Sequence, residues 1–334
     1  MEALVNDNKI LETITGSFLY GTNVETSDKD YVGIFIAPTK YYLGLEKVEE
    51  VDLSIVSKLE NGKNSEDAID RKYYEFRKYI KLAIENNPNI LSMLFASDNC
   101  ITYSGMFGMG LLDMRKDFLH KGLTERYLGY AFSQKHKMII KTDNYTGLKK
   151  FDEWLDDNLV SPNLGTPKDP SEYYSNQLLA ELRTIKSLNG IVKFSSQNAA
   201  IGDINISLTD KLSKVRAKIK QRLSKVGNRE ELYTKYGYDV KFGMNLVRLM
   251  LEGHELLETG NLIYPLTDRQ TLLDIRNGKW KREEIIQYAE DLEQDIKALR
   301  EKSPLPSHPQ YDKINEYLVK TVKGFWLYKD TYGR

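Results

Sequence analysis

Two short runs near the start of the chain carry residues whose types and spacing could do chemistry. Residues 15–22 (TGSFLYGT) form a turn of small residues directly after a β-prone run. Residues 27–30 (SDKD) place two carboxylates two positions apart at the head of another β-prone run, and ten residues separate Ser17 from Asp28. Side chains at i and i+2 of a strand point to the same face, so we expect Asp28 and Asp30 to project together.

This combination is what a cation and a phosphate require. Two neighbouring carboxylates repel each other unless a cation lies between them. The backbone N–H groups at Gly16 are not obstructed by a side chain. Together the runs predict a phosphate-binding turn beside a Mg²⁺ site, as in phosphoryl or nucleotidyl transfer. Each run alone is also typical of an ordinary turn or of a solvated strand start.

A third carboxylate is expected from a neighbouring strand, because a pair of metal ions usually needs one. Asp70 follows a loop and begins a β-prone stretch, so we predict that it completes the site. The alternative is an Asp on the surface or at a helix N-terminus.

The rest of the sequence predicts the elements that position these residues. Residues 9–60 are expected to form a small sheet unit, and the chain is predicted to be predominantly helical after residue 110, with one candidate helix at 173–188. Gly and Pro residues predict a loop-rich segment at 142–172. The expected fold is α+β: a catalytic domain with a mixed sheet and helices over residues 1–120, followed by a helical domain over 121–334 with a variable insertion around 142–230.

Composition narrows the class of protein without identifying a partner. The chain has 334 residues, with 48 Lys and Arg balanced by 48 Asp and Glu, so nucleic-acid contact would need a local patch rather than a global field. The single cysteine, Cys100, fits a reducing compartment, and we expect a cytoplasmic protein. No apolar run approaches 18 residues, so no membrane span is expected.

The motifs, taken in order, resemble the DNA polymerase β-type nucleotidyltransferase superfamily, and in particular the bacterial and viral predicted nucleotidyltransferases that include RNA-ligase-associated polymerases. The resemblance begins with Gly-Ser-x-x-Tyr-Gly and with Ser-Asp-x-Asp followed by Gly33. It continues at residues 41–45, 70–79, 87–91, 129–134, 237–241, 246–249, 255–260, 275–278 and 302–306. It covers about residues 9–135 and 235–320.

The resemblance implies an enzyme and a set of roles. Asp28, Asp30 and Asp70 would bind Mg²⁺ or Mn²⁺, and Ser17 with the backbone at Gly16 would hold the β- and γ-phosphates of a nucleoside triphosphate such as ATP. The implied nucleotide-binding set is Gly16, Ser17, Tyr20, Gly21, Lys241 and Arg248. The implied reaction moves a nucleoside monophosphate to a hydroxyl, expected on an RNA or DNA end during repair, and releases pyrophosphate.

Two other functions fit the same motifs. The Gly-Ser-x10-Asp-x-Asp spacing is also similar to that of antitoxins that adenylylate a protein, although those chains are usually much shorter, and a small-molecule acceptor is a related option. A non-catalytic nucleotide sensor could use the same fold. Phe18, Phe242 and Asn245 stand where relatives often carry polar or basic residues, which leaves the substrate open.

Two basic segments could contact phosphates. Lys241, Asn245 and Arg248 share one face of a predicted helix and could bind triphosphate, or could be its solvated side. Between residues 211 and 229 there are eight basic residues and no acidic one. This segment is either a solvated helix face or a contact for nucleic acid, through Lys214, Lys218, Lys220 and Arg222.

Overall fold

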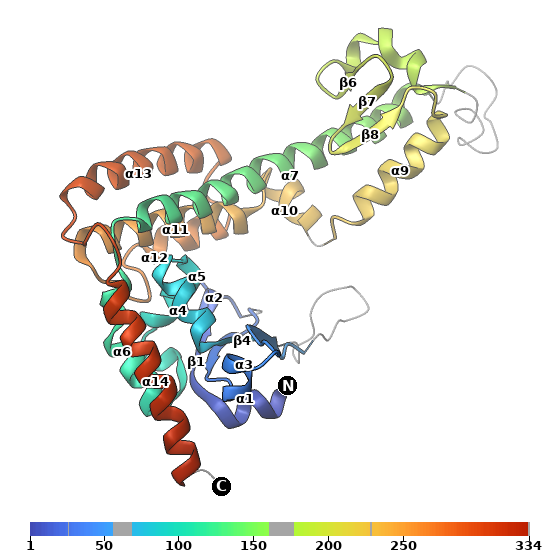
Figure 1. Cartoon of the computed structure of the whole chain (residues 1–334). Coiled ribbons are helices and arrows are strands. Elements are labelled where there is room, and N and C mark those ends of the chain that lie inside the picture. Colours follow the sequence, from blue (N-terminus) through green and yellow to red (C-terminus); the bar gives the residue numbers. More distant parts are fainter. Residues whose placement is uncertain (26, 56–68, 160–176, 228, 333–334) are drawn as a thin grey trace. The chain divides into compact units, whose positions relative to one another are not determined.

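The computed structural model describes residues 1–25, 27–55, 69–159, 177–227 and 229–332 (Figure 1). The chain divides into two compact units. Unit 1 comprises Met1–Lys135 and Lys241–Arg334, and unit 2 is His136–Val240. This division does not test whether residues 1–120 fold separately from 121–334, so the expected domain boundary stays a prediction.

Unit 1 is built on a mixed five-stranded sheet with the order β3-β4-β2-β1-β5. Its strands are β1 (Lys9–Thr15), β2 (Asp30–Phe35), β3 (Glu50–Asp52), β4 (Asp70–Glu75) and β5 (Ile101–Ser104). The pair β2 and β4 is parallel, and the other neighbouring pairs are antiparallel. The α+β class with a mixed N-terminal sheet is therefore confirmed.

Helices follow the strands and pack on the sheet. Helices α4 (Phe76–Ile84), α5 (Pro88–Leu94) and α6 (Met106–Asp113) contact its strands. The side chain of Glu75 accepts a hydrogen bond from the Lys78 N–H at the start of α4, and that of Asn87 accepts one from the Asn89 N–H at the start of α5. These caps satisfy backbone donors that the first turn of a helix leaves unpaired. The remaining short helices are α1 (Glu2–Asn8), α2 (Gly16–Tyr20), α3 (Thr39–Leu43), η1 (Asp98–Cys100) and η2 (Arg115–Phe118).

The C-terminal part of the chain returns to unit 1 as four helices. They are α11 (Val240–Thr259), α12 (Arg269–Arg276), α13 (Arg282–Lys302) and α14 (Tyr311–Tyr332). Helix α14 contacts α4 and runs beside α6 (Figure 1). The Phe325 ring on α14 lies 5.4 Å from the Phe107 ring on α6, measured between centroids. Segments far apart in the sequence therefore share one packed body.

Gly33 leaves room for a buried polar contact beneath the sheet. A Cβ at Gly33 would lie 2.3 Å from the Tyr73 ring, so only glycine fits there. The Tyr73 hydroxyl donates a hydrogen bond to the carboxylate of Glu12, which also accepts one from Thr102 Oγ1 at 2.8 Å. Burial acts to raise the pKa of Glu12, but these hydrogen bonds and Lys9 lower it overall. The packing of the Tyr73 ring against Gly33, on the sheet face opposite Asp30, thus explains why a glycine follows the Ser-Asp-x-Asp run.

Unit 2 departs from the predicted loops and helices. Helix α7 (Leu123–Leu159) crosses from unit 1 into unit 2, so residues 142–159 are helical rather than loop-rich, and the rest of that predicted segment, 160–172, lies outside the described residues. The remaining elements are η3 (Leu179–Thr184), η4 (Lys186–Leu188), β6 (Val192–Phe194), β7 (Asn198–Ile201), β8 (Ile204–Ser207), α9 (Leu212–Ser224) and α10 (Arg229–Tyr236). The helix predicted at 173–188 is wrong for its described residues, which form the two 3₁₀ turns. The antiparallel sheet β6-β7-β8 was not predicted.

The packing of unit 2 explains these differences. Leu148, Phe151 and Leu155 lie at helical spacing and are buried in one cluster, which keeps α7 helical past Gly147. A Cβ at Gly147 would meet the backbone of Gly202 at 3.5 Å, so the glycine sits where the hairpin approaches the helix closely. Within the described ranges, no helix is both long and apolar enough to span a membrane.

Candidate active site

Strand pairing brings two of the predicted carboxylates side by side. In the parallel pair, Asp30 at the start of β2 is in register with Asp70 at the start of β4. In the antiparallel pair, Asp30 faces Thr15, the last residue of β1. Residues in register on adjacent strands project to the same face of a sheet. Asp70 therefore lies where the sequence predicted it, although its role as a metal ligand is not tested by its position.

The charged residues predicted for the site influence the carboxylate of Asp30. Burial raises the pKa of Asp30 to about 6, with further contributions from the negative charges of Asp70 and Asp28. Lys241, at the start of α11, acts in the opposite direction. Each of these residues must lie near Asp30 to have this effect, because screening by solvent weakens distant interactions.

The donor set has the chemistry that a hard cation prefers, because all three groups are carboxylates. Asp28 and Asp70 are exposed and Asp30 is partly buried. In the parts of the chain that the structure describes, however, no three Asp, Glu, His or Cys side chains form a ready-made metal cluster. The three carboxylates thus lie near the starts of β2 and β4 without forming one cluster.

Gly16 lies directly against the Asp30 carboxylate. Its φ is +64°, in the left-handed region, and a Cβ would lie 2.3 Å from Asp30 Oδ2. Gly16 begins the short helix α2, in which Ser17 is half-buried. The Ser17 carbonyl accepts a hydrogen bond of 2.9 Å from the Thr22 N–H. The predicted phosphate turn and the predicted metal ligands are therefore neighbours in the structure.

Gly21 closes this turn. Its φ is +69° and its N–H is directed to the carbonyls of Phe18 and Ser17, which is a common way to end a helix. A Cβ there would come within 2.7 Å of Pro265 Cβ. The position therefore demands glycine for two structural reasons, independent of any nucleotide.

Tyr20 and Arg248, both predicted to bind nucleotide, belong to a buried cluster. The Arg248 guanidinium lies 4.1 Å from the Tyr20 ring centroid and donates to both carboxylate oxygens of Glu252, at 2.8 and 2.9 Å. Burial acts to lower the pKa of Arg248, but Glu252 and nearby tyrosines raise it by more than burial lowers it, so the guanidinium stays charged. Glu252 also accepts a hydrogen bond of 2.9 Å from the Tyr264 hydroxyl. This arrangement favours a structural role for Arg248, and contact with triphosphate stays a prediction.

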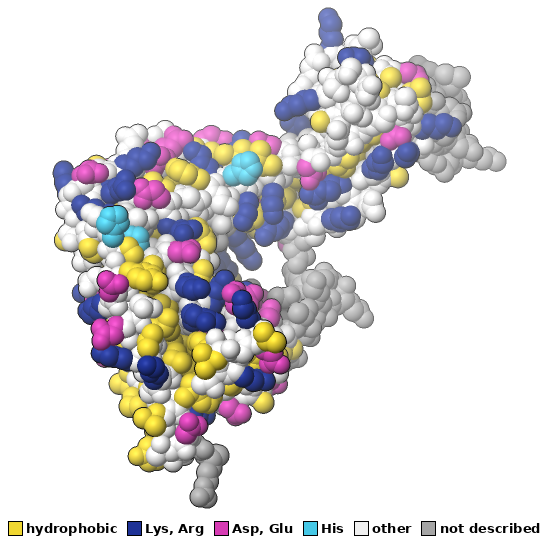
Figure 2. All heavy atoms as spheres, in the orientation of Figure 1, with side chains coloured by type: hydrophobic (Ala, Val, Ile, Leu, Met, Phe, Trp, Pro, Cys, Tyr) yellow, Lys and Arg dark blue, Asp and Glu magenta, His cyan; other side chains and the backbone are white. Residues whose placement is uncertain are grey.

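The predicted nucleic-acid contacts lie on α9 in unit 2, where most of them meet carboxylates. Lys214 and Lys218 lie 2.8 and 2.9 Å from the two oxygens of Asp210. Arg222 donates to Asp203 Oδ2 at 2.8 and 2.7 Å, and Lys220 is exposed. Figure 2 likewise shows basic side chains interspersed with acidic ones over the face of unit 2 in view. Exposed ion pairs contribute only about 0–1 kcal/mol, so they could exchange for phosphate contacts.

Two residues near the site had no role predicted from the sequence. Ser54 Oγ donates to Asp70 Oδ1 and accepts from the Arg71 N–H, both at 3.0 Å. Arg276, at the end of α12, donates to the Thr22 carbonyl at 2.8 Å and to Ser27 Oγ at 3.3 Å. Ser54 is only 16 residues from Asp70, but both contacts depend on the tertiary fold.

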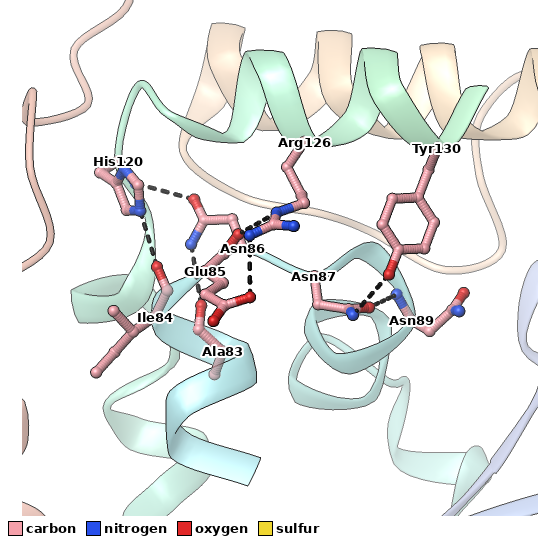
Figure 3. Close-up of polar contacts among 9 residues, drawn as sticks. All are labelled: Ala83, Ile84, Glu85, Asn86, Asn87, Asn89, His120, Arg126 and Tyr130. Atoms are coloured by element: carbon pink, nitrogen blue, oxygen red, sulfur yellow. Dashed lines mark hydrogen bonds and ion pairs between the residues drawn. The ribbon is translucent and has the colours of Figure 1, made fainter. Parts of the chain in front are cut away.

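A pocket of about 600 Å³ lies elsewhere in unit 1, where α4 ends and α7 begins. Figure 3 shows four of its lining residues, Glu85, His120, Arg126 and Tyr130, in polar contacts with one another or with neighbouring residues. Arg126 donates to the Glu85 carboxylate at 2.9 Å, and Tyr130 accepts a hydrogen bond from Asn87 at 2.8 Å. None of the predicted site residues lines this pocket. Its groups hold α7 against α4 and α5.

Comparison with known proteins finds a match over the part of the chain that contains the five-stranded sheet. Residues 4–151 match a model of the RNA repair pathway DNA polymerase beta family. An uncharacterized 38.9 kDa protein in the nrdC-mobD intergenic region of Enterobacteria phage T4 is 25% identical over 306 residues, which is 86% of this chain and 88% of that protein. No solved structure matches the chain significantly. The resemblance to the DNA polymerase β-type nucleotidyltransferases that the motifs predicted is thus confirmed over residues 4–151.

Proposed function

We propose that the chain is a metal-dependent nucleotidyltransferase that moves a nucleoside monophosphate from a nucleoside triphosphate to a hydroxyl at an RNA end. The observation that carries this proposal is the register of Asp30 with Asp70, with Gly16 against the Asp30 carboxylate. The choice of RNA is supported by the description of the matched family as an RNA repair pathway family. A cytoplasmic site of action would keep the buried, unpaired Cys100 reduced.

Asp28, Asp30 and Asp70 would hold Mg²⁺ or Mn²⁺. When bound, the cation would neutralise charge on the transferring phosphate and on the leaving pyrophosphate. Burial and the negative charges of Asp70 and Asp28 raise the pKa of Asp30, and a cation bound among these carboxylates would offset their repulsion. Ser54 supports the site by orienting the Asp70 carboxylate through its hydroxyl.

The chain's other residues would bind and orient the substrates. Gly16 and Ser17 would hold the β- and γ-phosphates, and Lys241 would add a positive charge on the side of α11. Tyr20 and Gly21 would shape the turn. The acceptor oxygen forms a bond to the α-phosphorus while the bond from that phosphorus to the bridging oxygen breaks, and pyrophosphate leaves. Asp70 would accept or orient the proton of the acceptor hydroxyl.

The proposal is tested by offering the wild-type protein each labelled nucleoside triphosphate with Mg²⁺ and separate RNA, DNA and protein acceptors. We expect label on RNA and an equal amount of released pyrophosphate. Chelation of the metal should abolish labelling, and excess Mg²⁺ should restore it. Label on protein alone, or nucleotide binding with no labelled acceptor, would overturn the proposal in favour of an adenylylating enzyme or a nucleotide sensor.

A further inference from the structure

The connection between α2 and β2 links the two halves of the candidate site. It leaves the turn that carries Ser17 and arrives at the carboxylates Asp28 and Asp30. Its described residues form no helix or strand, and Val24 and Glu25 are exposed. Within the connection, the Ser27 N–H donates to the Val24 carbonyl and the Val24 N–H donates to Ser27 Oγ, both at 2.9 Å. These bonds close a local turn, and contacts from other parts of unit 1 add to what fixes the phosphate turn relative to the carboxylates.

Arg276 holds it at two points. One terminal nitrogen of the guanidinium donates to the Thr22 carbonyl at 2.8 Å, and the other donates to Ser27 Oγ at 3.3 Å. Thr22 is itself tied to the turn, because its N–H donates to the Ser17 carbonyl at 2.9 Å. Ser27 directly precedes Asp28. A single side chain thus joins the segment after Ser17 to the segment before Asp28.

The helix that carries Arg276 is a firm support. Leu272 and Ile275 of α12 are fully buried. The helix ends immediately after Arg276 with Gly278 at φ +71°. The Gly278 N–H donates to the Ile275 carbonyl and the Lys279 N–H to the Asp274 carbonyl, both at 3.0 Å. This closed end restricts movement of the Arg276 backbone relative to the packed face of α12.

The charge of Arg276 is also unusual for its surroundings. The guanidinium is half-buried, and its two hydrogen bonds in the described part of the chain go to neutral oxygens. Burial lowers the pKa of Arg276, with no carboxylate raising it. Desolvating a cation without an anionic partner costs free energy. Arginine suits this position because its planar fork can donate to two acceptors at once, whereas lysine is a point charge.

We propose that Arg276 is a positioning residue for the nucleotidyl-transfer site, holding Thr22 and Ser27 so that the Ser17 turn and the Asp28 carboxylate keep a fixed separation. The expected effect on nucleotidyl transfer rests on the proposed function, whereas the contacts of Arg276 with Thr22 and Ser27 do not. Arg276 lies outside residues 4–151, the region that matches the family model. The C-terminal helices would therefore complete a site whose carboxylates all come from the N-terminal part of the chain.

The test compares Arg276→Gln and Arg276→Lys with Lys279→Gln, which removes a nearby charge that pairs with Asp274 and leaves the connection untouched. The measurements are Mn²⁺ affinity by titration and hydrogen exchange of the amides of residues 22–29. Loss of a residue that orients metal ligands typically weakens metal binding by about 10–100-fold. We expect both Arg276 variants to lose about tenfold in Mn²⁺ affinity and to exchange faster in this segment, with Lys279→Gln unchanged.

Two results would overturn the inference. Wild-type affinity and exchange in Arg276→Gln would overturn the inference, and so would full rescue by Arg276→Lys, because charge alone would then suffice. If Arg276→Gln fails to fold, Ser27→Ala removes the Oγ that accepts from both Arg276 and the Val24 N–H, leaves α12 undisturbed, and should weaken Mn²⁺ binding in the same direction. Wild-type protein that binds Mn²⁺ but labels no acceptor would refute the proposed function while leaving the Arg276 comparison valid.

Discussion

Asp30 is the residue at which chemistry and stability conflict most directly. It is partly buried, faces Asp70 across parallel strands, and has a pKa raised to about 6 by burial and by two neighbouring negative charges. A carboxylate in this environment stabilises the fold when protonated and destabilises it when ionised. The protein keeps it there at a cost to stability, which is a common property of functional sites.

Asp30→Asn is therefore expected to stabilise the metal-free protein above pH 6. Because the folded pKa lies above the ordinary value of 3.8, the folded state binds the proton more tightly, and wild-type stability falls as pH rises from about 4 to 6. The full shift would correspond to at most about 3 kcal/mol, and solvent screening reduces the expected gain to about 1 kcal/mol. Unfolding in denaturant at pH 4 and pH 7.5 measures it. An equal effect at both pH values would contradict the prediction.

Gly16→Ala should abolish transfer while costing only modest stability. A residue with a Cβ at φ +64° costs about 1–2 kcal/mol, and the added methyl group would push the Asp30 carboxylate aside. Gly260→Ala is a matched control, since its φ is +62° and its Cβ would meet only Leu305 at 3.5 Å. Both variants should lose similar stability in thermal unfolding, and only Gly16→Ala should lose activity. Normal transfer by Gly16→Ala would separate Gly16 from the site.

At the scale of elements, the parallel pairing of β2 with β4 does most to assemble the site. The sequence could predict that Asp70 begins a strand beside Asp30, because acidic residues at two strand starts are local signals. It could not predict Arg276, whose contacts lie 254 and 249 residues away and depend on the packing of α12. The missed hairpin of β7 and β8 did carry a local signal. The dipeptide Gly202-Asp203 joins the two strands, and a glycine at the first position is typical of two-residue hairpin loops.

The buried pair on α11 offers a direct test of whether Arg248 touches nucleotide. Arg248→Met should destabilise the fold by about 3–5 kcal/mol, because it leaves the carboxylate of Glu252 buried and unpaired. Adding Glu252→Gln removes that charge and keeps an acceptor for Tyr264, so the double variant should recover most of the loss. If the role is structural, the double variant will also keep the wild-type KM for nucleoside triphosphate. A stable double variant with a greatly raised KM would show direct binding.

At the scale of the whole molecule, unit 1 carries the proposed transfer site and unit 2 carries the basic helix α9. The chain as a whole has no net charge, and α9 shares its surface with Asp203 and Asp210. Binding of RNA would therefore exchange internal ion pairs for phosphate contacts. Such binding should be moderate in affinity and strongly dependent on salt.

Neutralising Lys218, Lys220 and Arg222 to Gln should weaken RNA binding and flatten its salt dependence. For single-stranded RNA, the slope of log affinity against log salt should fall by about 0.7 for each phosphate that these side chains neutralise in the wild type. The matched control is the exposed set Arg183, Lys186 and Lys193, changed in the same way in the same unit. Fluorescence anisotropy at several salt concentrations provides the measurement. Equal losses of affinity in both triple variants would show a general charge effect instead of a contact by α9.

The central claim is that the carboxylates at the starts of β2 and β4 perform nucleotidyl transfer, and Mg²⁺-dependent labelling of RNA tests it most directly. Wild-type protein, Asp28→Asn, Asp30→Asn and Glu25→Gln are compared, the last being an exposed carboxylate of the same connection. We predict transfer with pyrophosphate release by wild type and Glu25→Gln, and none by the two Asp variants although all four proteins are folded. Unchanged turnover in Asp28→Asn or Asp30→Asn would contradict the assignment of this site.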